Sequence, residues 1–396
     1  MHICVKYRLL PTRSQETALN GILSLCRDVY NSLVLERTAL WETARQSLSL
    51  REQQASLTRW KQAHPELFGV HSQVLQNVAV RVDLAFQAFF RRIKAGEKPG
   101  YPRLKGRGVY DSITFPQVPS GCKLKLTGDG TGDVLDLSKV GEVKVVAHRP
   151  LVGTPKTCTI RRWNGKWFAC FACEVEREPL PPSEESVGID VGLHHFAALS
   201  DGSFVPNPRF FRKDEKALAK AQRKLARQQK GSPARRRARK VVSRVHERIR
   251  NRRHNFVHQL ARKLVNRYGT IAVEKLNIQG MVQNHCLAKS ISDASWSQFR
   301  TVLTQKAESA ARRVIAVNPA YTSQDCSGCG YRAKEKKRLK ERWHLCPVCG
   351  LSLDRDTNAA CNILQAAQTL QTALGQQSVV GIPSIPSMLG RLGIPT

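Results

Sequence analysis

The segment VGIDVGLHHFAALSDGSFV, residues 187–205, decides the fold of the second half of the chain. Val187, Ile189 and Val191 alternate with other residues, a period of two that predicts a β-strand with one apolar face. A tight turn and two further short strands are predicted to follow. Asp190 lies on the opposite face of the first strand, which helices covering the sheet would remove from water. Because a buried carboxylate costs free energy unless it binds something, Asp190 is a candidate functional residue.

Two further acidic positions complete a pattern with Asp190. Glu274 lies in TIAVEKLNI, at a strand position where valine or isoleucine is expected. Asp354 and Asp356 precede TNAACNILQAA, whose apolar spacing predicts a helix, so one of them lies near its N-cap. Acids on a first strand, a later strand and a C-terminal helix follow the order in which RNase H-like nucleases build their metal site. Such carboxylates hold two divalent ions ~3.5–4 Å apart, which activate water and stabilise the leaving oxygen of a phosphodiester.

Four cysteines have the spacing of a zinc ribbon. They form the pairs CSGC and CPVC, separated by sixteen residues: Cys326, Cys329, Cys346 and Cys349. Two such pairs supply four thiolates to one tetrahedral Zn²⁺, so a structural zinc site is predicted. Cys170 and Cys173 are also three apart, but residues three apart on a strand point to opposite faces, and they are not expected to share an ion.

The first half of the chain predicts a β domain with a helical insertion. Residues 1–10 alternate polar and apolar side chains, as a half-buried strand does. Helical patterns follow, strongest over 71–95, where the expected apolar stripe includes Phe90 and Ile93. From about residue 110 to 178 short alternating runs predict strands, and Asn-Gly in RRWNGKWFACF predicts a two-residue hairpin turn. A small barrel or curved sheet, with residues 1–10 as one strand, is expected.

The charge of the chain indicates a polyanionic partner. Lys and Arg number 64 against 31 Asp and Glu, a formal charge of +33, which favours nucleic acid. No apolar run approaches the ~20 residues of a membrane-spanning helix, and no signal peptide is recognised, so no membrane partner is expected. Residues 209–253 hold nineteen Lys or Arg and three acids in a predicted helical hairpin. This face is expected to follow nucleic-acid phosphates, with Arg244, Arg248 and Arg252 as candidate contacts.

Several segments resemble the signature segments of the TnpB family, the OrfB proteins of insertion sequences. In the second half these are VGIDVGLHHFA, IAVEKLNIQGM, NPAYTSQDCSGCG and CPVCGLSLDRDTNAACNI; in the first half they are VKYRLLPTRSQETAL, AFQAFFRRIKAGEKPGYPRLK and SITFPQ. The resemblance implies an RNA-guided DNA endonuclease with a RuvC-like domain, related to type V CRISPR effectors. It implies that Asp190, Glu274 and Asp356 are the catalytic residues and magnesium ligands, with Asp354 second in rank for the third position.

The resemblance also implies an α+β, multidomain architecture. A β-barrel (wedge) domain carries an inserted helical recognition domain, and an RNase H-like (RuvC) α/β domain with an inserted zinc ribbon follows. The expected boundaries are 1–10 and 110–180 for the wedge, 11–109 for the recognition insertion, 186–325 and 350–372 for the nuclease, 326–349 for the ribbon and 373–396 for a disordered tail.

Cofactors and partners follow from the same resemblance. Two catalytic Mg²⁺ and one structural Zn²⁺ are expected, with a guide RNA from the transposon end and double-stranded target DNA carrying a short adjacent motif. Gln73, Gln76 and Asn77 are candidates for reading that motif, although an ordinary hydrated helix face explains them equally well. Tyr321 and Gln324 are candidate contacts to the strand being cut, with turn residues as the alternative. A prokaryotic cytoplasmic, nucleoid-associated location is expected.

Three other functions stay open at this point. An RNA-guided DNA-binding repressor would bind without cutting, a transposase would join DNA ends, and an RNA-processing nuclease would cut only its own guide precursor. The intact set of three acids favours a nuclease over a repressor. The oligomeric state does not follow from the sequence.

Overall fold

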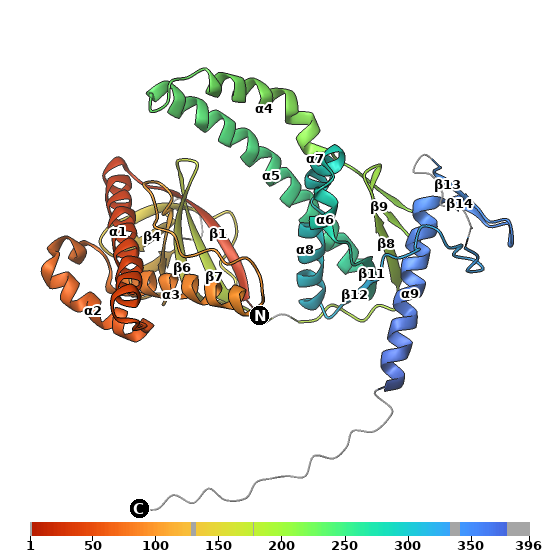
Figure 1. Cartoon of the computed structure of the whole chain (residues 1–396), viewed down its shortest axis with the longest axis horizontal. Coiled ribbons are helices and arrows are strands. Elements are labelled where there is room, and N and C mark those ends of the chain that lie inside the picture. The colour runs from red at the N-terminus through yellow and green to blue at the C-terminus, as the bar shows by residue number, and fades with distance from the viewer. Residues whose placement is uncertain (1, 128–131, 177, 333–340, 378–396) are drawn as a thin grey trace, which may run out of the picture. The chain divides into compact units, whose positions relative to one another are not determined.

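The computed structural model of the chain describes residues 2–127, 132–176, 178–332 and 341–377 (Figure 1). It divides into two compact units, 1–176 and 177–396, and each is described by itself. Within the described ranges, no helix combines the length and apolar character that a membrane span needs. The expected disordered tail lies mostly outside the described residues, although its first residues belong to helix α9 (Arg355–Gln377).

A seven-stranded antiparallel sheet forms the centre of the first unit, in the order β2-β6-β7-β1-β5-β4-β3. Its strands are β1 (His2–Leu10), β2 (Ser112–Phe115), β3 (Cys122–Lys125), β4 (Val134–Leu137), β5 (Gly141–Val146), β6 (Thr154–Trp163) and β7 (Lys166–Glu174). Among the described residues no pairing joins β2 to β3, so of the two expected forms, a small barrel or a curved sheet, the structure has an open half-barrel. The helices of this unit share one hydrophobic core with the sheet. They cover apolar surface that the sheet would bury against itself if it closed into a barrel.

The predicted hairpin turn joins β6 and β7. Asn164 and Gly165 have φ values of 50° and 72°, the positive backbone angles that a type I′ turn requires. The turn sets a register in which Trp163 pairs with Lys166. On β7, Cys173 is buried and Cys170 only partly so.

The helices of the first unit lie between β1 and β2, as the insertion pattern predicts. They are α1 (Arg13–Ala44), α2 (Leu50–Ala63), the 3-10 helix η1 (Pro65–Gly69) and α3 (Ser72–Lys94). The apolar stripe predicted over 71–95 lies on α3, but its last members Phe90 and Ile93 are 54% and 48% exposed. The last turns of α3 lie against the following loop, where Tyr101 packs edge-on against Phe86 and Phe89.

The second unit contains a mixed five-stranded sheet in the order β10-β9-β8-β11-β12. Its strands are β8 (Ser186–Val191), β9 (His195–Leu199), β10 (Phe204–Pro206), β11 (Thr270–Glu274) and β12 (Arg313–Val317). The first three are antiparallel, and β8, β11 and β12 are parallel. The central strands are buried on both faces, as a sheet covered by helices on both sides requires.

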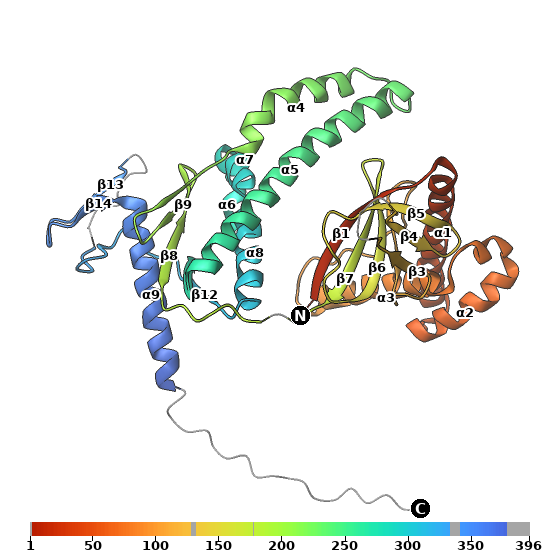
Figure 2. The same cartoon turned by 180° about the vertical axis from the view of Figure 1, so that it is seen from behind.

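Helices cover the two faces of this sheet (Figures 1 and 2). One face packs against α5 (Pro233–Arg267) and α8 (Trp296–Glu308), and the other against α9. The short helices α6 (Ile278–Val282) and α7 (His285–Ala294) follow β11. Helix α4 (Phe210–Ala226) and α5 form the predicted helical hairpin, which extends beyond the sheet and has its own small core of Leu218, Val245 and Ile249.

Candidate active site and metal centre

The sheet places Asp190 and Glu274 side by side. Strands β8 and β11 are parallel neighbours, and Ile189 pairs with Val273, so the next residue of each strand lies beside the other. Paired positions on adjacent strands are ~4.8 Å apart and point to the same face. Both side chains are only partly exposed. Two distant acidic positions therefore meet at the ends of two central strands.

Helix α9 brings Asp356 to the same place because β8 contains a glycine. A Cβ atom built at Gly188 would lie 2.0 Å from the carbonyl oxygen of Ala360, so the helix backbone rests directly on the strand. A Cβ atom built at Gly192, just after β8, would lie 4.0 Å from Oδ2 of Asp356. The first turn of α9 thus delivers its carboxylate to the loop that follows Asp190.

The negative charges of Glu274 and Asp356 both act on Asp190. Burial raises the pKa of Asp190 well above its ordinary value, and the negative charges of Glu274 and Asp356 raise it further. Burial also raises the pKa of Glu274, against a hydrogen bond that the Thr322 hydroxyl donates to Glu274 Oε1 at 2.6 Å. Like charges held in this way are costly, and a cation would remove that cost.

The two aspartates at the start of α9 have different roles. The Asp354 carboxylate accepts from the backbone N–H of Asp356 at 2.8 Å and of Thr357 at 3.4 Å, so it caps the helix. The charge of Asp356 acts on Asp190. Arg342, just before β13 (Trp343–Leu345), forms an ion pair with Asp356. This contact places a guanidinium at the rim of the carboxylate group.

The four ribbon cysteines form a compact cluster. Their sulfur atoms all lie within 4.8 Å of one another, and the distances Cys326–Cys349 and Cys329–Cys346 are 3.5 Å. Four thiolates ~2.3 Å from a tetrahedral zinc ion are about 3.8 Å apart, so the donor set fits zinc. The backbone N–H of Cys349, against burial, lowers the pKa of Cys346 to about 6. Against their own backbone N–H donors, burial and neighbouring sulfur atoms raise the pKa of Cys329 and Cys349.

Hydrogen bonds connect this cluster to α9. The Asn358 side chain accepts from the backbone N–H of Ser327 at 2.9 Å and donates to the carbonyl of Asp325 at 2.7 Å. Asn362 donates to the carbonyls of Thr322 and Asp325 at 2.8 Å. On the other side of the ribbon, β13 pairs with β14 (Ser352–Asp354), which runs directly into α9. The ribbon therefore supports the helix turn that carries Asp356.

The candidate nucleic-acid contacts in the first unit are mostly engaged within the protein. Gln73 donates to Gln117 at 2.6 Å, and Asn77 accepts from Arg81 at 3.1 Å. Gln76 is exposed. The structure thus leaves Gln76 as the member of the predicted trio whose side chain faces water.

The candidate contacts in the second unit also differ in their surroundings. Tyr321 is half exposed, and the guanidinium of Arg332 stacks 3.7 Å from its ring centroid, while Gln324 is only partly exposed.

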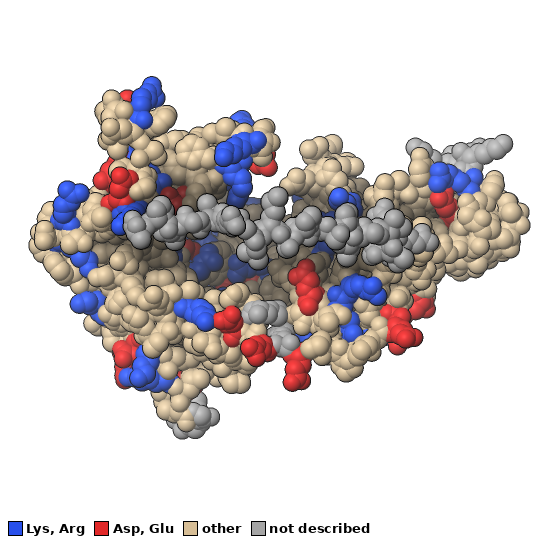
Figure 3. Space-filling model, turned by 90° about the horizontal axis from the view of Figure 1, so that it is seen from below, with Lys and Arg blue, Asp and Glu red and all other residues tan. Residues whose placement is uncertain are grey.

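The charged row on α5 is partly neutralised. Arg244, Arg248 and Arg252 are exposed and four residues apart, but Asp214 of α4 pairs with Arg248 at 3.6 Å and with Arg252 at 3.2 Å. The positive charge of this row is therefore partly offset by Asp214. Figure 3 shows a different face of the molecule, seen from below the view of Figure 1, on which acidic and basic side chains also mix.

Sequence reasoning missed several residues at these sites. Thr322, Arg342 and Gly188 contact or position the acids, and Asn358 and Asn362 connect the ribbon to the helix. Only Gly188 had a signal in the sequence, because a glycine in a buried strand often marks a close approach of another backbone.

Comparison with known proteins gives a consistent result. Residues 170–285 match the OrfB_IS605 family model, described as "Probable transposase", and residues 296–363 match the Cas12f1-like TNB domain. Residues 1–46 match a model described as a helix-turn-helix domain, although here they form β1 and the single long helix α1. A solved structure titled as the mini-RNA-guided endonuclease CRISPR-Cas_phi3 has a TM-score of 0.52 and 9% identity, covering 93% of this chain and 92% of its own. This last likeness concerns the fold alone.

Two curated relatives match over most of their length. A protein of Streptomyces pristinaespiralis, provisionally named an RNA-guided DNA endonuclease, is 34% identical over 91% of this chain and 88% of its own. InsQ of Escherichia coli K12, provisionally given the same name, is 30% identical over 96% of this chain and 95% of its own. From these matches and the family models, the chain belongs to the TnpB family, the OrfB proteins of insertion sequences.

Proposed function

We propose that the chain is an RNA-guided DNA endonuclease that cuts DNA at the three-carboxylate site. One observation carries the proposal: Asp190 is buried within the fields of Glu274 and Asp356, at the ends of two central strands. A nuclease that holds divalent cations needs such a group, whereas a binding protein without cleavage would not need to bear its cost. The names of the two curated relatives support the same activity.

The topology of the second unit supports a RuvC-like nuclease domain. Its strands lie in the order β10-β9-β8-β11-β12. Strands β10, β9 and β8 are antiparallel neighbours, and β11 and β12 run parallel to β8. This order, with these directions, is that of RNase H-like domains. In that arrangement the acids on β8 and β11 face a helix that follows the last strand, which is where α9 carries Asp356. This arrangement supports Asp190, Glu274 and Asp356 as the residues of the proposed site.

Each residue at the site has a definable task. Asp190, Glu274 and Asp356 would hold two Mg²⁺, whose preferred ligands are oxygens, and these ions would activate water and stabilise the leaving oxygen. The Thr322 hydroxyl fixes the orientation of Glu274. Cys326, Cys329, Cys346 and Cys349 would hold one structural Zn²⁺ and keep the start of α9 in place.

In this proposal, base pairing by a guide RNA supplies the sequence specificity for the target DNA. A guide RNA encoded at the transposon end would pair with the target strand, so the protein would contact mainly phosphates through its excess of Lys and Arg. A short duplex motif beside the target would be read by the first unit, with Gln76 as the exposed candidate. Such a protein would act in the prokaryotic cytoplasm, at the nucleoid.

Expression of the gene with its flanking DNA tests the proposal. The protein should copurify with one discrete RNA that ends in a variable guide, and this complex should cut a plasmid that matches the guide in the presence of Mg²⁺. An otherwise identical complex of the Asp190→Asn variant should bind the same plasmid without cutting it. Binding without cleavage by the unsubstituted protein would favour the repressor, and joined DNA products would favour a transposase.

A further inference from the structure

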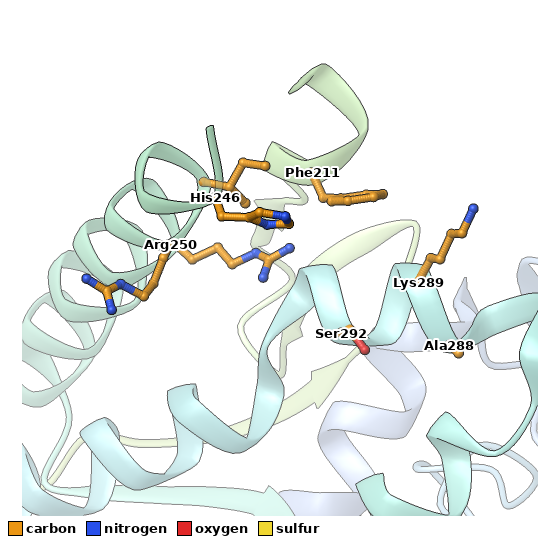
Figure 4. A pocket seen from close by; sticks show the side chains of 8 residues that line it. Phe211, His246, Arg250, Ala288, Lys289 and Ser292 are labelled. Atoms are coloured by element: carbon orange, nitrogen blue, oxygen red, sulfur yellow. The ribbon is translucent and has the colours of Figure 1, made fainter. Parts of the chain in front are cut away.

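Two pockets outside the carboxylate group differ in whether their cations are already engaged. The larger one, about 570 Å³, lies between α4, α5 and α7 (Figure 4). The basic side chains in its lining all have partners within the protein: Arg250, Arg253 and Lys289. An anionic ligand would have to displace these contacts, so this pocket presents no free positive charge.

The smaller pocket, about 250 Å³, lies in the helical insertion of the first unit. It is formed by α1, by the segment between α1 and α2, and by the end of α3 with the loop that follows. Five of its nine lining residues are aromatic: Trp41, Phe86, Phe89, Phe90 and Tyr101. This aromatic pocket is smaller than the ~300–1,000 Å³ of sites for drug-sized ligands, so it suits a single flat ring system.

Contacts between the rings hold the aromatic pocket in shape. Tyr101 packs edge-on against Phe86 and Phe89, with ring centroids 5.7 Å and 5.3 Å apart. Phe89 packs in the same manner against Phe90 at 5.2 Å. A hydrogen bond of 3.0 Å between the hydroxyls of Tyr101 and Thr38 joins the loop to α1. The pocket is therefore preformed, and a ligand would bind without first ordering its walls.

Three of the rings are nevertheless half exposed. Trp41 is 51% exposed, Phe90 54% and Tyr101 47%. Covering apolar surface of this kind stabilises a complex in proportion to the area removed from water. Large apolar side chains that gather at one place on a surface mark a binding site, whereas scattered ones do not. The rings are thus available to a partner that covers them.

The chain beside the aromatic pocket is strongly basic. Residues 91–107 hold seven Lys or Arg and one acid. Lys94 is exposed and follows Phe90 by four residues on α3, so the two lie on one side of the helix. Arg45, at the end of α1, lies over the Trp41 ring at 5.7 Å. Among the residues that the structure describes, no acidic side chain pairs with Lys94 or Arg45, so both charges are available to an anion.

Arg37 lines the same pocket but is engaged. It pairs with Asp83 at 3.0 Å and donates to Gln53 at 2.6 Å, so its charge is balanced within the protein. Its guanidinium also lies over the Phe86 ring at 5.2 Å. Arg37 therefore belongs to the fixed wall of the pocket rather than to the cations that a ligand can use.

The combination of rings and free cations favours a nucleobase over another protein surface. A second copy of the chain would bring the same basic segment, and two molecules with a formal charge of +33 repel each other. A nucleic-acid strand offers a flat ring with a negative phosphate beside it, and every base has a face that stacks on an aromatic side chain. Because the bases of a duplex already stack on their neighbours, the fitting occupant is an unpaired base.

We propose that the aromatic pocket binds one unpaired base of a single-stranded nucleic acid, stacked on the exposed rings, with the neighbouring phosphates held by Lys94 and Arg45. The inference rests on the proposed function, which brings guide RNA and DNA to the protein. The base comes from either of these, since both present the same kinds of ring and phosphate. A base held in the pocket is kept out of the duplex, so the pocket sets one end of a paired segment.

Fluorescent oligomers test this with the full-length protein, expressed without its flanking DNA and kept in Mg²⁺-free buffer. One probe is a uridylate oligomer and the other a thymidylate oligomer, each with a single 2-aminopurine whose emission falls when its base stacks. The probe that the unsubstituted protein quenches more strongly identifies RNA or DNA as the source. Phe90→Leu and Trp41→Leu should each remove most of the quenching at saturation and weaken binding about tenfold, the scale of one base on an aromatic ring.

Phe68→Leu is the matched control for the rings. Phe68 is 56% exposed in η1, in the same unit but outside the lining of the pocket, and this variant should bind and quench as the unsubstituted protein does. Trp41→Phe keeps an aromatic ring and should retain most of the quenching that Trp41→Leu loses. Equal losses in Phe68→Leu and Phe90→Leu would overturn the stacking role of the pocket.

A second pair of variants tests the charge. Lys94 and Lys123 are both exposed in the first unit, and Lys123 lies on β3, outside the lining. Lys94→Gln should weaken binding several-fold more than Lys123→Gln does. Equal losses would leave only general electrostatic attraction and overturn the phosphate contact at the pocket.

Sedimentation of the protein without nucleic acid tests the other occupant. The unsubstituted protein should remain a monomer at micromolar concentration. A dimer that Trp41→Leu and Phe90→Leu both convert to a monomer would show that a second copy of the chain covers the rings, and the proposal would be overturned.

The outcome is independent of the cleavage assay. If Phe90→Leu and Trp41→Leu bind and quench normally while guided cleavage by the unsubstituted complex still depends on Asp190, the pocket proposal fails and the proposed function stands. If the probes respond to these variants as expected but the unsubstituted complex cuts no DNA, the pocket stands and the proposed cleavage fails.

Discussion

The second unit contains two groups of ligand-type side chains that were assembled in opposite ways. The cysteine cluster comes from one local segment, residues 326–349, and its four sulfur atoms lie within 4.8 Å of one another. The acids at 190, 274 and 356 come from two strands and a helix far apart in the sequence, and they meet only because the sheet and α9 pack together. Local spacing determines the first group, and tertiary packing determines the second.

This difference has an energetic counterpart. Among its described residues, 326–332 and 341–349, the ribbon has little apolar core, with Cys326 and Cys346 among the few that are buried, so a metal would supply much of its stability. The acids are embedded in a well-packed sheet, which holds them together even though their charges repel. On the proposed function, the ribbon should therefore depend on its Zn²⁺ to fold, whereas the three acids should depend on the folded sheet and α9 to bind Mg²⁺.

The largest expected effect is on cleavage when an acid loses its charge. Asp190→Asn or Glu274→Gln should each lower guided cleavage by roughly a hundredfold to a thousandfold, a common scale for removing one group that stabilises transition-state charge. Plasmid cleavage over time measures this. Asp354→Asn is the control, because asparagine also caps helices and should keep near-normal activity. Equal losses in all three variants would mean that Asp354 belongs to the site.

A smaller loss is expected when the cysteine cluster is broken. Cys346→Ser, or treatment with a zinc chelator, should lower cleavage by about tenfold to a hundredfold, as loss of supporting groups around metal sites does. The physical reason is that Asn358 and Asn362 would lose their fixed partners and α9 its alignment. Zinc content and cleavage rate should fall together. Cys286→Ser, at an exposed cysteine outside the cluster, should change neither.

The contact between β8 and α9 predicts an effect on stability. Gly188→Ala would place a Cβ atom 2.0 Å from a backbone oxygen, so the helix must move, at a cost of about 1–3 kcal/mol in the free energy of unfolding. Urea unfolding and guided cleavage should both report the change. Gly21→Ala in α1, where nothing lies within 4 Å, should be neutral or stabilising. An undiminished stability in Gly188→Ala would contradict the close packing on which the position of Asp356 depends.

The smallest expected effect is a gain in stability. The folded-state pKa of Asp190 is raised by burial and by its acidic neighbours, so its contribution favours folding at low pH and is lost as pH rises through the raised value. Asp190→Asn should therefore increase the free energy of unfolding at neutral pH, without divalent ions, by on the order of 1 kcal/mol. The gain should vanish near the ordinary aspartate pKa of about 4. Urea titrations at several pH values measure this gain. A lower free energy of unfolding for Asp190→Asn at neutral pH would contradict the repulsion between Asp190 and its acidic neighbours.

Much of the fold followed from local patterns in the sequence. The strand at 1–10, the Asn-Gly turn and the helical hairpin all occur where the pattern predicts them, because each depends on residues close in sequence. The choice between a small barrel and a curved sheet, and the exposure of Phe90 and Ile93, were not predictable, since both depend on what lies across from a segment in space.

The candidate site shows the same division. The acidic residue types and their order along the predicted strands and helix indicated the carboxylate site. The spacing of the two cysteine pairs indicated the zinc site. The contacts of Thr322 with Glu274 and of Arg342 with Asp356 could be found only in the tertiary structure. The same holds for the ion pairs that Asp214 forms with Arg248 and Arg252, because ordinary residue types at irregular separations carry no signal in the sequence.

The two stems of the ribbon both return to the first turns of α9. Asp325 and Ser327 are tied to asparagines of the helix, and on the other side the backbone N–H of Arg355 donates to the carbonyl of Arg342 at 2.8 Å. The first turns of α9 are thus held from both sides of the cysteine cluster, so a change at either stem should reach the turn that carries Asp356.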